Sequence, residues 1–361
     1  MQKTSDKIKK VKVGISHGDI NGIGYEIILK SLSDPRMMDL FTPIIYGSSK
    51  VASYYRKAIG LKDMNFNIIE KSGTPHHKKA NLIEVTNKEV KIEMGKSSQA
   101  AGELAYSALE SSVEGLKQNN VDVLVTAPIN KHNIQSESFD FPGHTEYLAK
   151  KFNAEDYLML MVSGGLRLGV VTGHIPIQKV PEALTVDLIL SKIRILHKSL
   201  VQDFGIAKPK IALLGLNPHA GDEGLLGKEE IDVIIPAIQK AFEEEILAFG
   251  PFPADGFFGA SSYKNYDGIL AMYHDQGMIA FKTLSFDSGV NYTAGLPIVR
   301  TSPAHGTAYE IAGKRQASTA SFNQAIYLAI DIFKNRKMHA ELTKDPLEVS
   351  APEENNHNEK A

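Results

Sequence analysis

Three histidines stand just after short apolar segments of this 361-residue chain, and their placement is the pattern with the most chemical content. They are His174 after Leu168–Thr172, His219 after Ile211–Leu214, and His274 after Gly268–Met272. Each apolar segment has the length and composition of a buried strand. Ligands of open α/β sheets bind just beyond the carboxyl ends of the strands. Three imidazoles at that edge therefore form a candidate divalent metal site.

Acidic neighbours strengthen this interpretation, although a single histidine is more often a structural residue. Asp275 is positioned to orient His274 or to bind a cation directly, and Asp222 and Glu223 place carboxylates near His219. The chain has no cysteine, so it has neither disulfides nor thiolate ligands. A metal would be held by nitrogen and oxygen atoms.

A second set of residues has the chemistry of an anion site. In the GHTE segment, Thr145 as an N-cap would place backbone N–H groups beside the His144 ring, although an ordinary capped helix fits as well. Lys282, Asn291 and Arg300 each follow a strand-like stretch. Buried cations need a partner, and either an internal salt bridge or a phosphorylated or carboxylated substrate would provide it.

A glycine-rich segment, His17–Gly24, lies between a strand and a helix as a dinucleotide-binding turn would. The required G-x-G-x-x-G spacing fails because position 27 is isoleucine. The segment is therefore a poor signal for a Rossmann domain.

Periodicity predicts alternating strands and helices, and hence α/β layers around a largely parallel sheet. The expected elements are strands at Val11–Ser16, Ile44–Tyr46 and Val121–Ala127, and helices from Tyr25 and at Lys50–Ile59, Gln99–Gln118, Leu184–Val201, Lys228–Phe242 and Thr319–Lys334. Lys71–Met94 is expected to be an exposed loop or hairpin, and 345–361 a disordered tail.

Composition excludes several classes of protein. Forty Lys and Arg residues balance 42 Asp and Glu residues, so the net charge of −2 does not favour nucleic acid or an anionic membrane as a partner. The chain begins with a polar, lysine-rich segment and has no apolar run of membrane-spanning length. A cytoplasmic location is expected.

Taken together, the motifs resemble those of the 4-hydroxythreonine-4-phosphate dehydrogenase family of vitamin B6 biosynthesis, over about 11–333. The matching segments are GHTEYLA (143–149), TGHIP (172–176), LNPHAGDEG (216–224), PADGFF (253–258), YHDQG (273–277) and GLPIVRTSPAHGTAYEIAGK (295–314). Three departures from the family pattern are the Tyr309-Glu310 pair, Arg315, and a first turn that reads GDINGIGYE.

The resemblance implies an architecture like that of isocitrate and isopropylmalate dehydrogenases, with two α/β/α domains and a cleft between them, and no Rossmann domain. The implied domains are 1–137 with 300–344, and 138–299. It also implies a homodimer with its active site at the interface. The implied site residues are His174, His219 and His274 for a divalent metal (zinc, magnesium or cobalt), His144, Thr145, Lys282, Asn291 and Arg300 for the phosphorylated substrate, and His305, Gly306, Thr307 and Ala308 for the cofactor.

The implied reaction is NAD- or NADP-linked oxidation of 4-phosphooxy-L-threonine to a 3-oxo acid, which decarboxylates to 3-amino-2-oxopropyl phosphate. The metal would lower the pKa of the substrate hydroxyl, and Lys282 or Asp275 would take its proton. One alternative is the same chemistry on 4-phosphothreonate or 4-phosphoerythronate. A metal-dependent hydrolase and a non-catalytic phosphate-binding protein are further alternatives.

Overall fold

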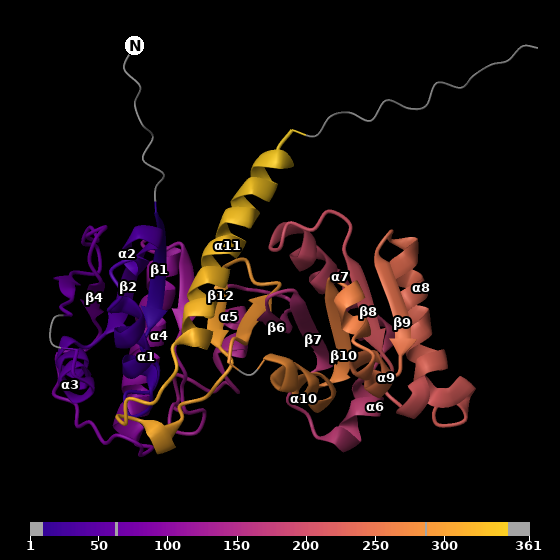
Figure 1. Cartoon of the computed structure of the whole chain (residues 1–361), viewed down its shortest axis with the longest axis horizontal. Helices are drawn as coiled ribbons and strands as arrows, with labels where there is room; N and C mark the ends of the chain where they lie inside the picture. The colour runs from indigo at the N-terminus through magenta and orange to yellow at the C-terminus, as the bar shows by residue number, and fades with distance from the viewer. Residues whose placement is uncertain (1–9, 62–63, 286, 346–361) are drawn as a thin grey trace, which may run out of the picture.

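The computed structural model describes residues 10–61, 64–285 and 287–345 and contains one sheet of twelve strands (Figure 1). The strand order is β3-β4-β2-β1-β5-β12-β11-β6-β7-β10-β8-β9. The strands are β1 (Val11–Ser16), β2 (Phe41–Gly47), β3 (Asn67–Ile69), β4 (Asn81–Glu84), β5 (Val123–Thr126), β6 (Leu158–Ser163), β7 (Leu166–Thr172), β8 (Lys210–Leu214), β9 (Leu247–Phe252), β10 (Gly268–Tyr273), β11 (Val290–Ala294) and β12 (Arg300–Pro303).

Two parallel groups of strands make up most of the sheet, as expected. The first group runs from β3 to β12, and the second comprises β7, β10, β8 and β9. Between them, β11 is antiparallel to both β12 and β6, and β6 is antiparallel to β7. The sheet therefore passes from one half of the molecule to the other through antiparallel pairs. The division into 1–137 with 300–344, and 138–299, stays a prediction.

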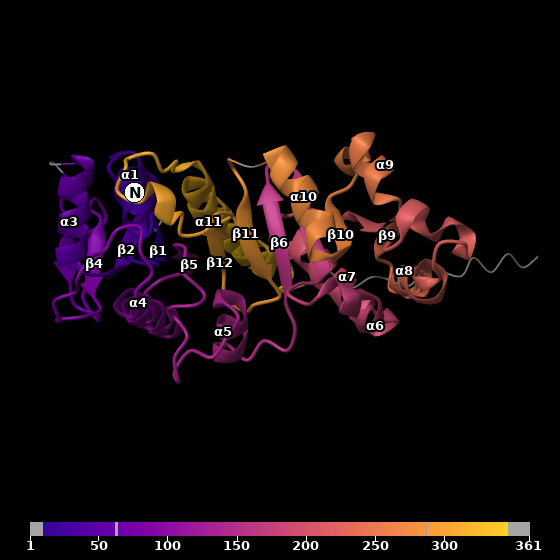
Figure 2. The same ribbon diagram turned by 90° about the horizontal axis from the view of Figure 1, so that it is seen from below.

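Helices cover both faces of the sheet. They are α1 (Gly24–Leu32), α2 (Met37–Leu40), α3 (Ser49–Ile59), α4 (Gln99–Lys117), α5 (His144–Lys151), α6 (Val180–Ala183), α7 (Val186–Gln202), α8 (Ile235–Glu243), α9 (Ala254–Gly259), α10 (His274–Ser285) and α11 (Ala320–Leu342), with single turns η1 (Ile177–Lys179), η2 (Pro218–Gly224), η3 (Glu230–Ile234), η4 (Ser262–Asn265) and η5 (Tyr309–Ile311). Figure 2 shows α11 and α5 on opposite sides of the central strands.

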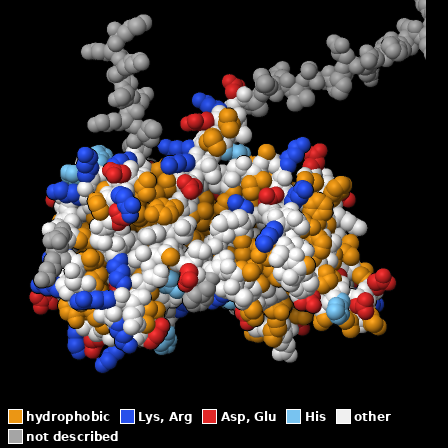
Figure 3. Space-filling model, viewed as in Figure 1, with side chains coloured by type: hydrophobic (Ala, Val, Ile, Leu, Met, Phe, Trp, Pro, Cys, Tyr) orange, Lys and Arg blue, Asp and Glu red, His pale blue; other side chains and the backbone are white. Residues whose placement is uncertain are grey.

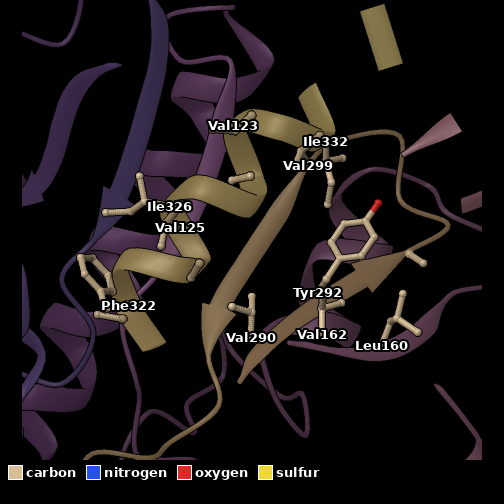
Figure 4. Close-up of a cluster of buried hydrophobic side chains, with 14 of the residues drawn as sticks. Val123, Val125, Leu160, Val162, Val290, Tyr292, Val299, Phe322, Ile326 and Ile332 are labelled. Atoms are coloured by element: carbon tan, nitrogen blue, oxygen red, sulfur yellow. The ribbon is translucent and has the colours of Figure 1, made fainter. Parts of the chain in front are cut away.

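One face of the sheet is covered along its whole length by a single hydrophobic core. Residues of α1, α3, α11, α7 and α8 belong to it. In the centre, Phe322 and Ile326 of α11 pack over Val125 and Val290, which come from strands of different halves (Figure 4). This face is closed because apolar residues recur at every second position of the strands and meet an equally apolar helix.

The opposite face carries two separate clusters instead of one. Under α4 and α5 the cluster includes Leu124, Phe139 and Leu148, and under α9 and α10 it includes Leu168 and Phe281. The central strands are not fully covered between these clusters. In Figure 3 the lower edge of the molecule is indented between the two halves.

Two expectations about local structure were wrong. The segment Lys71–Met94 is not entirely an exposed loop, because Asn81–Glu84 forms β4 and its first three residues are buried. Four residues flanked by polar turns are too short for periodicity to reveal. Lys282 does not follow a strand, since it lies within α10, and Asn291 and Arg300 lie within β11 and β12 instead of after a strand.

None of the helices in the described residues is both long enough and apolar enough to cross a membrane.

Candidate active site

A cavity of about 650 Å³ lies on the partly covered face of the central strands. Its floor includes Met159 and Met161 of β6, which pair with Thr293 and Asn291 of β11, and Asn291 pairs in turn with Ser302 of β12. These residues share a face because side chains alternate along a strand with a period of two. The antiparallel centre of the sheet thus carries polar side chains on the face that α11 does not cover.

Nine of the predicted site residues line this cavity: His144, Thr145, His174, His274, Lys282, Asn291, Arg300, His305 and Gly306. The sequence separates them by up to 162 positions, and the fold brings them together. The remaining four, His219, Asp275, Thr307 and Ala308, are not part of its lining.

Arg300 is the most unusual residue of the cavity. Its side chain is buried, and the guanidinium donates to the hydroxyl of Thr126 (Nη2–Oγ1 2.6 Å, Nε–Oγ1 3.1 Å) and more weakly to that of Thr293 (3.4 Å). Within the described part of the chain, no carboxylate lies within ion-pair distance of Arg300. Burial lowers the pKa of Arg300 to about 10, and the charge of Glu146 opposes this only in part.

The internal salt bridge that the sequence left open for Arg300 is thus absent from the described residues. A buried cation surrounded by neutral donors and hydroxyls is costly unless an anion enters from outside. The arrangement can bind a phosphate or carboxylate by its charge and through Nη1, which among the described residues donates only weakly to Thr293.

The start of α5 lies beside Arg300. The helix begins at His144, with Gly143 as its cap, so the expectation that Thr145 would be the N-cap was wrong. Instead, Thr145 Oγ1 lies 3.3 Å from Thr293 Oγ1, and His144 Nδ1 lies 3.1 Å from Arg300 Nη2.

Burial, followed by the charges of Arg300 and Lys131, holds the pKa of His144 well below its ordinary value. The neutral ring then accepts from Arg300 through Nδ1. Its buried Nε2, and the buried Oδ1 of Asn291, have no hydrogen-bond partner among the described residues. The cavity therefore offers a ligand one polar atom beside the guanidinium, His144 Nε2, and a second one at Asn291.

Two of the three histidines meet at the cavity. The rings of His174 and His274 have centroids 5.8 Å apart, and their strands β7 and β10 are parallel neighbours. The Nδ1 of His274 is 2.7 Å from Asp275 Oδ1, and the Nδ1 of His174 is 4.0 Å from Glu146 Oε1. Burial, with a contribution from Lys131, lowers the pKa of His174, which favours the neutral ring that binds metals.

His219 follows β8, the other neighbour of β10, but it is not grouped with this pair. Over the residues that the structure describes, no three His, Cys, Asp or Glu side chains form a metal cluster. Two imidazoles with carboxylates close to their ring nitrogens fit part of a divalent site with nitrogen and oxygen ligands. The three-histidine site itself stays a prediction.

The two candidates for a general base differ in position. Lys282 lines the cavity from α10, and no carboxylate among the described residues pairs with it. Asp275 is exposed and engaged with the His274 ring. Geometry therefore favours Lys282 near a substrate, whereas Asp275 is better placed to orient His274.

The glycine-rich first turn has no room for a dinucleotide. All of its residues from His17 to Gly24 are buried, and the carbonyl of Thr307 accepts from the N–H of Ile23 at 3.0 Å. A Cβ on Gly22 would lie 2.7 Å from the same carbonyl oxygen. The start of α1 is thus occupied by the 305–314 loop, in agreement with the failed fingerprint.

Tyr309, one of the departures from the family pattern, anchors that loop to the first turn. Tyr309 donates from its hydroxyl to Asp19 Oδ2 at 2.7 Å, and Asn133 donates to the same oxygen at 2.8 Å. Burial and the bond to Asp19 raise the pKa of Tyr309 to about 12. Ala308, just before it, has a left-handed backbone (φ 44°). The first turn and the loop are therefore one buried unit.

Several residues in and around the cavity were not predicted from the sequence. Lys131 and Glu146 line the cavity near His174, and Thr126 and Thr293 hold Arg300. Their types are ordinary at the ends of strands and in helix starts. The one signal available was the alternation that places Thr293 on the same face as Asn291, two positions earlier.

Comparison with known proteins agrees with this geometry. The model of the family described as pyridoxal phosphate biosynthetic protein PdxA matches residues 39–329. A protein of Bacteroides thetaiotaomicron named 4-hydroxythreonine-4-phosphate dehydrogenase is 52% identical over 94% of this chain and 93% of its own. A Clostridium botulinum protein with the provisional name D-threonate 4-phosphate dehydrogenase is 36% identical over 88% of this chain and 95% of its own.

Solved structures give the same result. The crystal structure of 4-hydroxythreonine-4-phosphate dehydrogenase from Klebsiella pneumoniae superposes with a TM-score of 0.77 at 32% identity, covering 91% of this chain and 99% of the other. The match extends across both halves of the sheet and the cavity between them. The chain belongs to the pyridoxal phosphate biosynthetic protein PdxA family.

Proposed function

We propose that this chain is a metal-dependent, NAD- or NADP-linked dehydrogenase that oxidises the secondary alcohol of 4-phosphooxy-L-threonine. The 3-oxo acid formed would lose carbon dioxide to give 3-amino-2-oxopropyl phosphate, a step of pyridoxine 5′-phosphate biosynthesis. The observation that carries the proposal is the buried Arg300 guanidinium, which faces the cavity without a carboxylate among the described residues. Family membership supports the redox chemistry.

The anionic substrate would be bound by the polar groups around Arg300. The guanidinium would supply the positive charge, and the unpartnered Nε2 of His144, which carries the proton when Nδ1 accepts from Arg300, would donate to the anion. The Oδ1 of Asn291, which also lines the cavity, would accept from a hydroxyl or ammonium group of the substrate. Thr145 adds a hydroxyl at the start of α5. Together these groups recognise a phosphorylated acid by charge and by directed hydrogen bonds, and they fix the orientation of its carbon chain.

Lys282 would take the hydroxyl proton. The residue lines the cavity from α10, eight positions after His274 at the start of the same helix. A lysine amine can act as a general base for a hydroxyl within hydrogen-bond reach. Asp275, hydrogen-bonded to His274, would hold that ring in one tautomer.

His174 and His274 would hold a divalent cation, with His219 as the third ligand. When bound, the cation would polarise the substrate hydroxyl as a Lewis acid. The nicotinamide cofactor would supply the hydride acceptor. The segment His305–Ala308 would contact it, since His305 and Gly306 line the cavity and Thr307 ties the segment to α1.

A homodimer would complete this site. His219 lies outside the cavity of its own chain, on a loop that ends in the exposed residues Leu225 and Leu226. Ile177 and Ile279, 65% and 68% exposed, lie three and five positions along the chain from His174 and His274. Exposed apolar side chains near an incomplete site are typical of a protein interface. A second copy packed against this surface would complete the site at the interface.

A second candidate substrate is D-threonate 4-phosphate, which the name of the Clostridium botulinum relative favours. It has the same phosphate and hydroxyl groups, with a hydroxyl in place of the amine. The residues assigned above would serve both substrates.

The proposal is tested by following reduction of NAD and NADP on addition of 4-phosphooxy-L-threonine or D-threonate 4-phosphate, with each metal and after chelation. Metal-dependent reduction with the first substrate is expected. Reduction with the second substrate alone would reassign the substrate. Release of inorganic phosphate without any reduction would instead show a hydrolase and refute the proposal.

A further inference from the structure

The loop that carries His219 has an unusual backbone. Five consecutive residues, from His219 to Glu223, have left-handed φ angles of 54°, 52°, 84°, 44° and 53°. Only one of the five, Gly221, is a glycine, and residues with side chains adopt this region singly rather than in series. Such a run persists only where the surroundings hold it, and strain of this kind is concentrated at functional sites.

A buried carboxylate, that of Glu230, binds the backbone just before this loop. Glu230 is 2% exposed, and its Oε1 accepts from the N–H groups of Leu216 (2.7 Å) and Asn217 (2.8 Å). Its Oε2 accepts from Asn217 Nδ2 at 2.9 Å. A Cβ on Gly221 would lie 2.6 Å from this Oε2, so the glycine allows the carboxylate to reach the loop.

No Lys, Arg or His among the described residues forms an ion pair with Glu230. A buried carboxylate satisfied only by backbone and amide donors costs more desolvation than an apolar residue would. The contribution of Glu230 is therefore to fix the backbone conformation of Leu216 and Asn217. The left-handed run begins two residues after Asn217, at His219.

A second side chain joins this loop to the segment that carries His274. Gln276, in the first turn of α10, donates from Nε2 to the carbonyl of Gly215 at 2.6 Å and accepts at Oε1 from the N–H of Met272 at 2.7 Å. The ends of β8 and β10 are thereby fixed relative to each other. Any shift of the His219 loop would be transmitted to the residues just before His274.

We infer that Glu230 is a positioning residue for His219 as a metal ligand, and that Gln276 sets the His219 loop against the His274 segment. The inference rests on the metal site of the proposed function and extends it to two residues that touch neither metal nor substrate. Hydrogen-bond partners that orient a metal ligand typically contribute about 10- to 100-fold to metal affinity. A comparable effect is expected of Glu230.

The test is titration of the metal-free full-length protein with Co²⁺, read from the visible absorption of the bound ion. Glu230→Gln should weaken Co²⁺ binding at least tenfold, and at saturating metal it should retain most of the turnover rate. Asp232→Asn is the matched control, because Asp232 is an exposed carboxylate of the same helical turn. The control should leave both the affinity and the absorption band unchanged.

Circular dichroism shows whether each variant is folded, and Gln276→Leu replaces Glu230→Gln if the latter is not. Equal Co²⁺ affinity and an identical band in wild type and in the folded variant would overturn the inference. Loss of fold in both variants would also overturn it, since their role would then be in stability alone. If wild type itself binds no divalent cation, the metal part of the proposed function fails instead.

Discussion

Replacement of Arg300 by methionine separates a ligand-binding cation from a structural one. Methionine keeps much of the length of the side chain but removes the charge and the hydrogen bonds to Thr126, Thr293 and His144. If Arg300 served mainly to hold the fold, as half of a buried ion pair would, its removal would cost about 3–5 kcal/mol of stability.

The structure gives a different magnitude. Burial lowers the pKa of Arg300 from 12.5 to about 10, which corresponds to about 3 kcal/mol of unfavourable free energy for the charged form. The two hydrogen bonds of the charged guanidinium to Thr126 and His144 each contribute about 1.5 kcal/mol or more in the opposite direction. The two effects nearly cancel. We expect Arg300→Met to change the free energy of unfolding of the ligand-free protein by less than about 2 kcal/mol.

The ligand-bound protein should respond very differently. A ligand present at 100 times its dissociation constant stabilises the folded state by about 2.7 kcal/mol. Arg300→Met should abolish most of this gain, because removing one partner of a buried charge pair costs about 2–5 kcal/mol of binding. Urea unfolding with and without 4-phosphooxy-L-threonine measures both quantities. Arg194→Met, which removes an exposed ion pair with Glu244, is the control and should keep the full ligand effect.

The reasoning is refuted if Arg300→Met destabilises the ligand-free protein by more than about 3 kcal/mol while ligand stabilisation is retained. Arg300 would then be a structural residue, and the anion site would have to be sought elsewhere.

Three further predictions concern His17, Tyr309 and Ile279. Burial lowers the pKa of His17 from 6.5 to about 4, so stability should be full above pH 6.5 and fall by about 3 kcal/mol as the pH drops to 4. His17→Phe should flatten this dependence in urea unfolding, and parallel curves would contradict it. Tyr309→Phe leaves buried Asp19 short of a donor and should cost about 1–3 kcal/mol in thermal unfolding, with a several-fold higher KM for the nicotinamide cofactor; an unchanged KM would exclude a role in the cofactor loop. Ile279→Glu should convert a dimer to monomer in light scattering, whereas Ile68→Glu on edge strand β3 should not.

Strands with continuous apolar runs were predictable from the sequence. β1 has the predicted bounds. The three strands that precede His174, His219 and His274, namely β7, β8 and β10, are parallel as expected and lie side by side in the sheet. A strand buried on both faces must be apolar at every position, which leaves a clear pattern. Lys282 was misplaced because a short apolar run before it, Met278–Phe281, fits a buried helix as well as a strand.

The candidate site was predictable in its membership but not in its geometry. Residue types identify Arg300 and His144 as candidates, whereas their contact depends on the register of β11 against β12 and on where α5 begins. The backbone conformation at His219 could not be predicted from the sequence, for a different reason. Four of the five left-handed residues of this loop carry side chains. His219 and Asp222 are of types that adopt this region more often than most, but Ala220 and Glu223 are not, so residue types do not predict the run.

The position of β12 at the centre of the sheet has a consequence for the order of events during synthesis. β12 is the strand that pairs β5 with the rest of the sheet, yet it begins 174 residues after Thr126, the last residue of β5. Val123 and Val125 are covered by α11, which the ribosome makes later still (Figure 4). β5 thus leaves the ribosome with one open edge and with the apolar face that α11 later covers still bare. This edge and this face stay uncovered until nearly the whole chain has been synthesised. During this interval the nascent protein is exposed to aggregation.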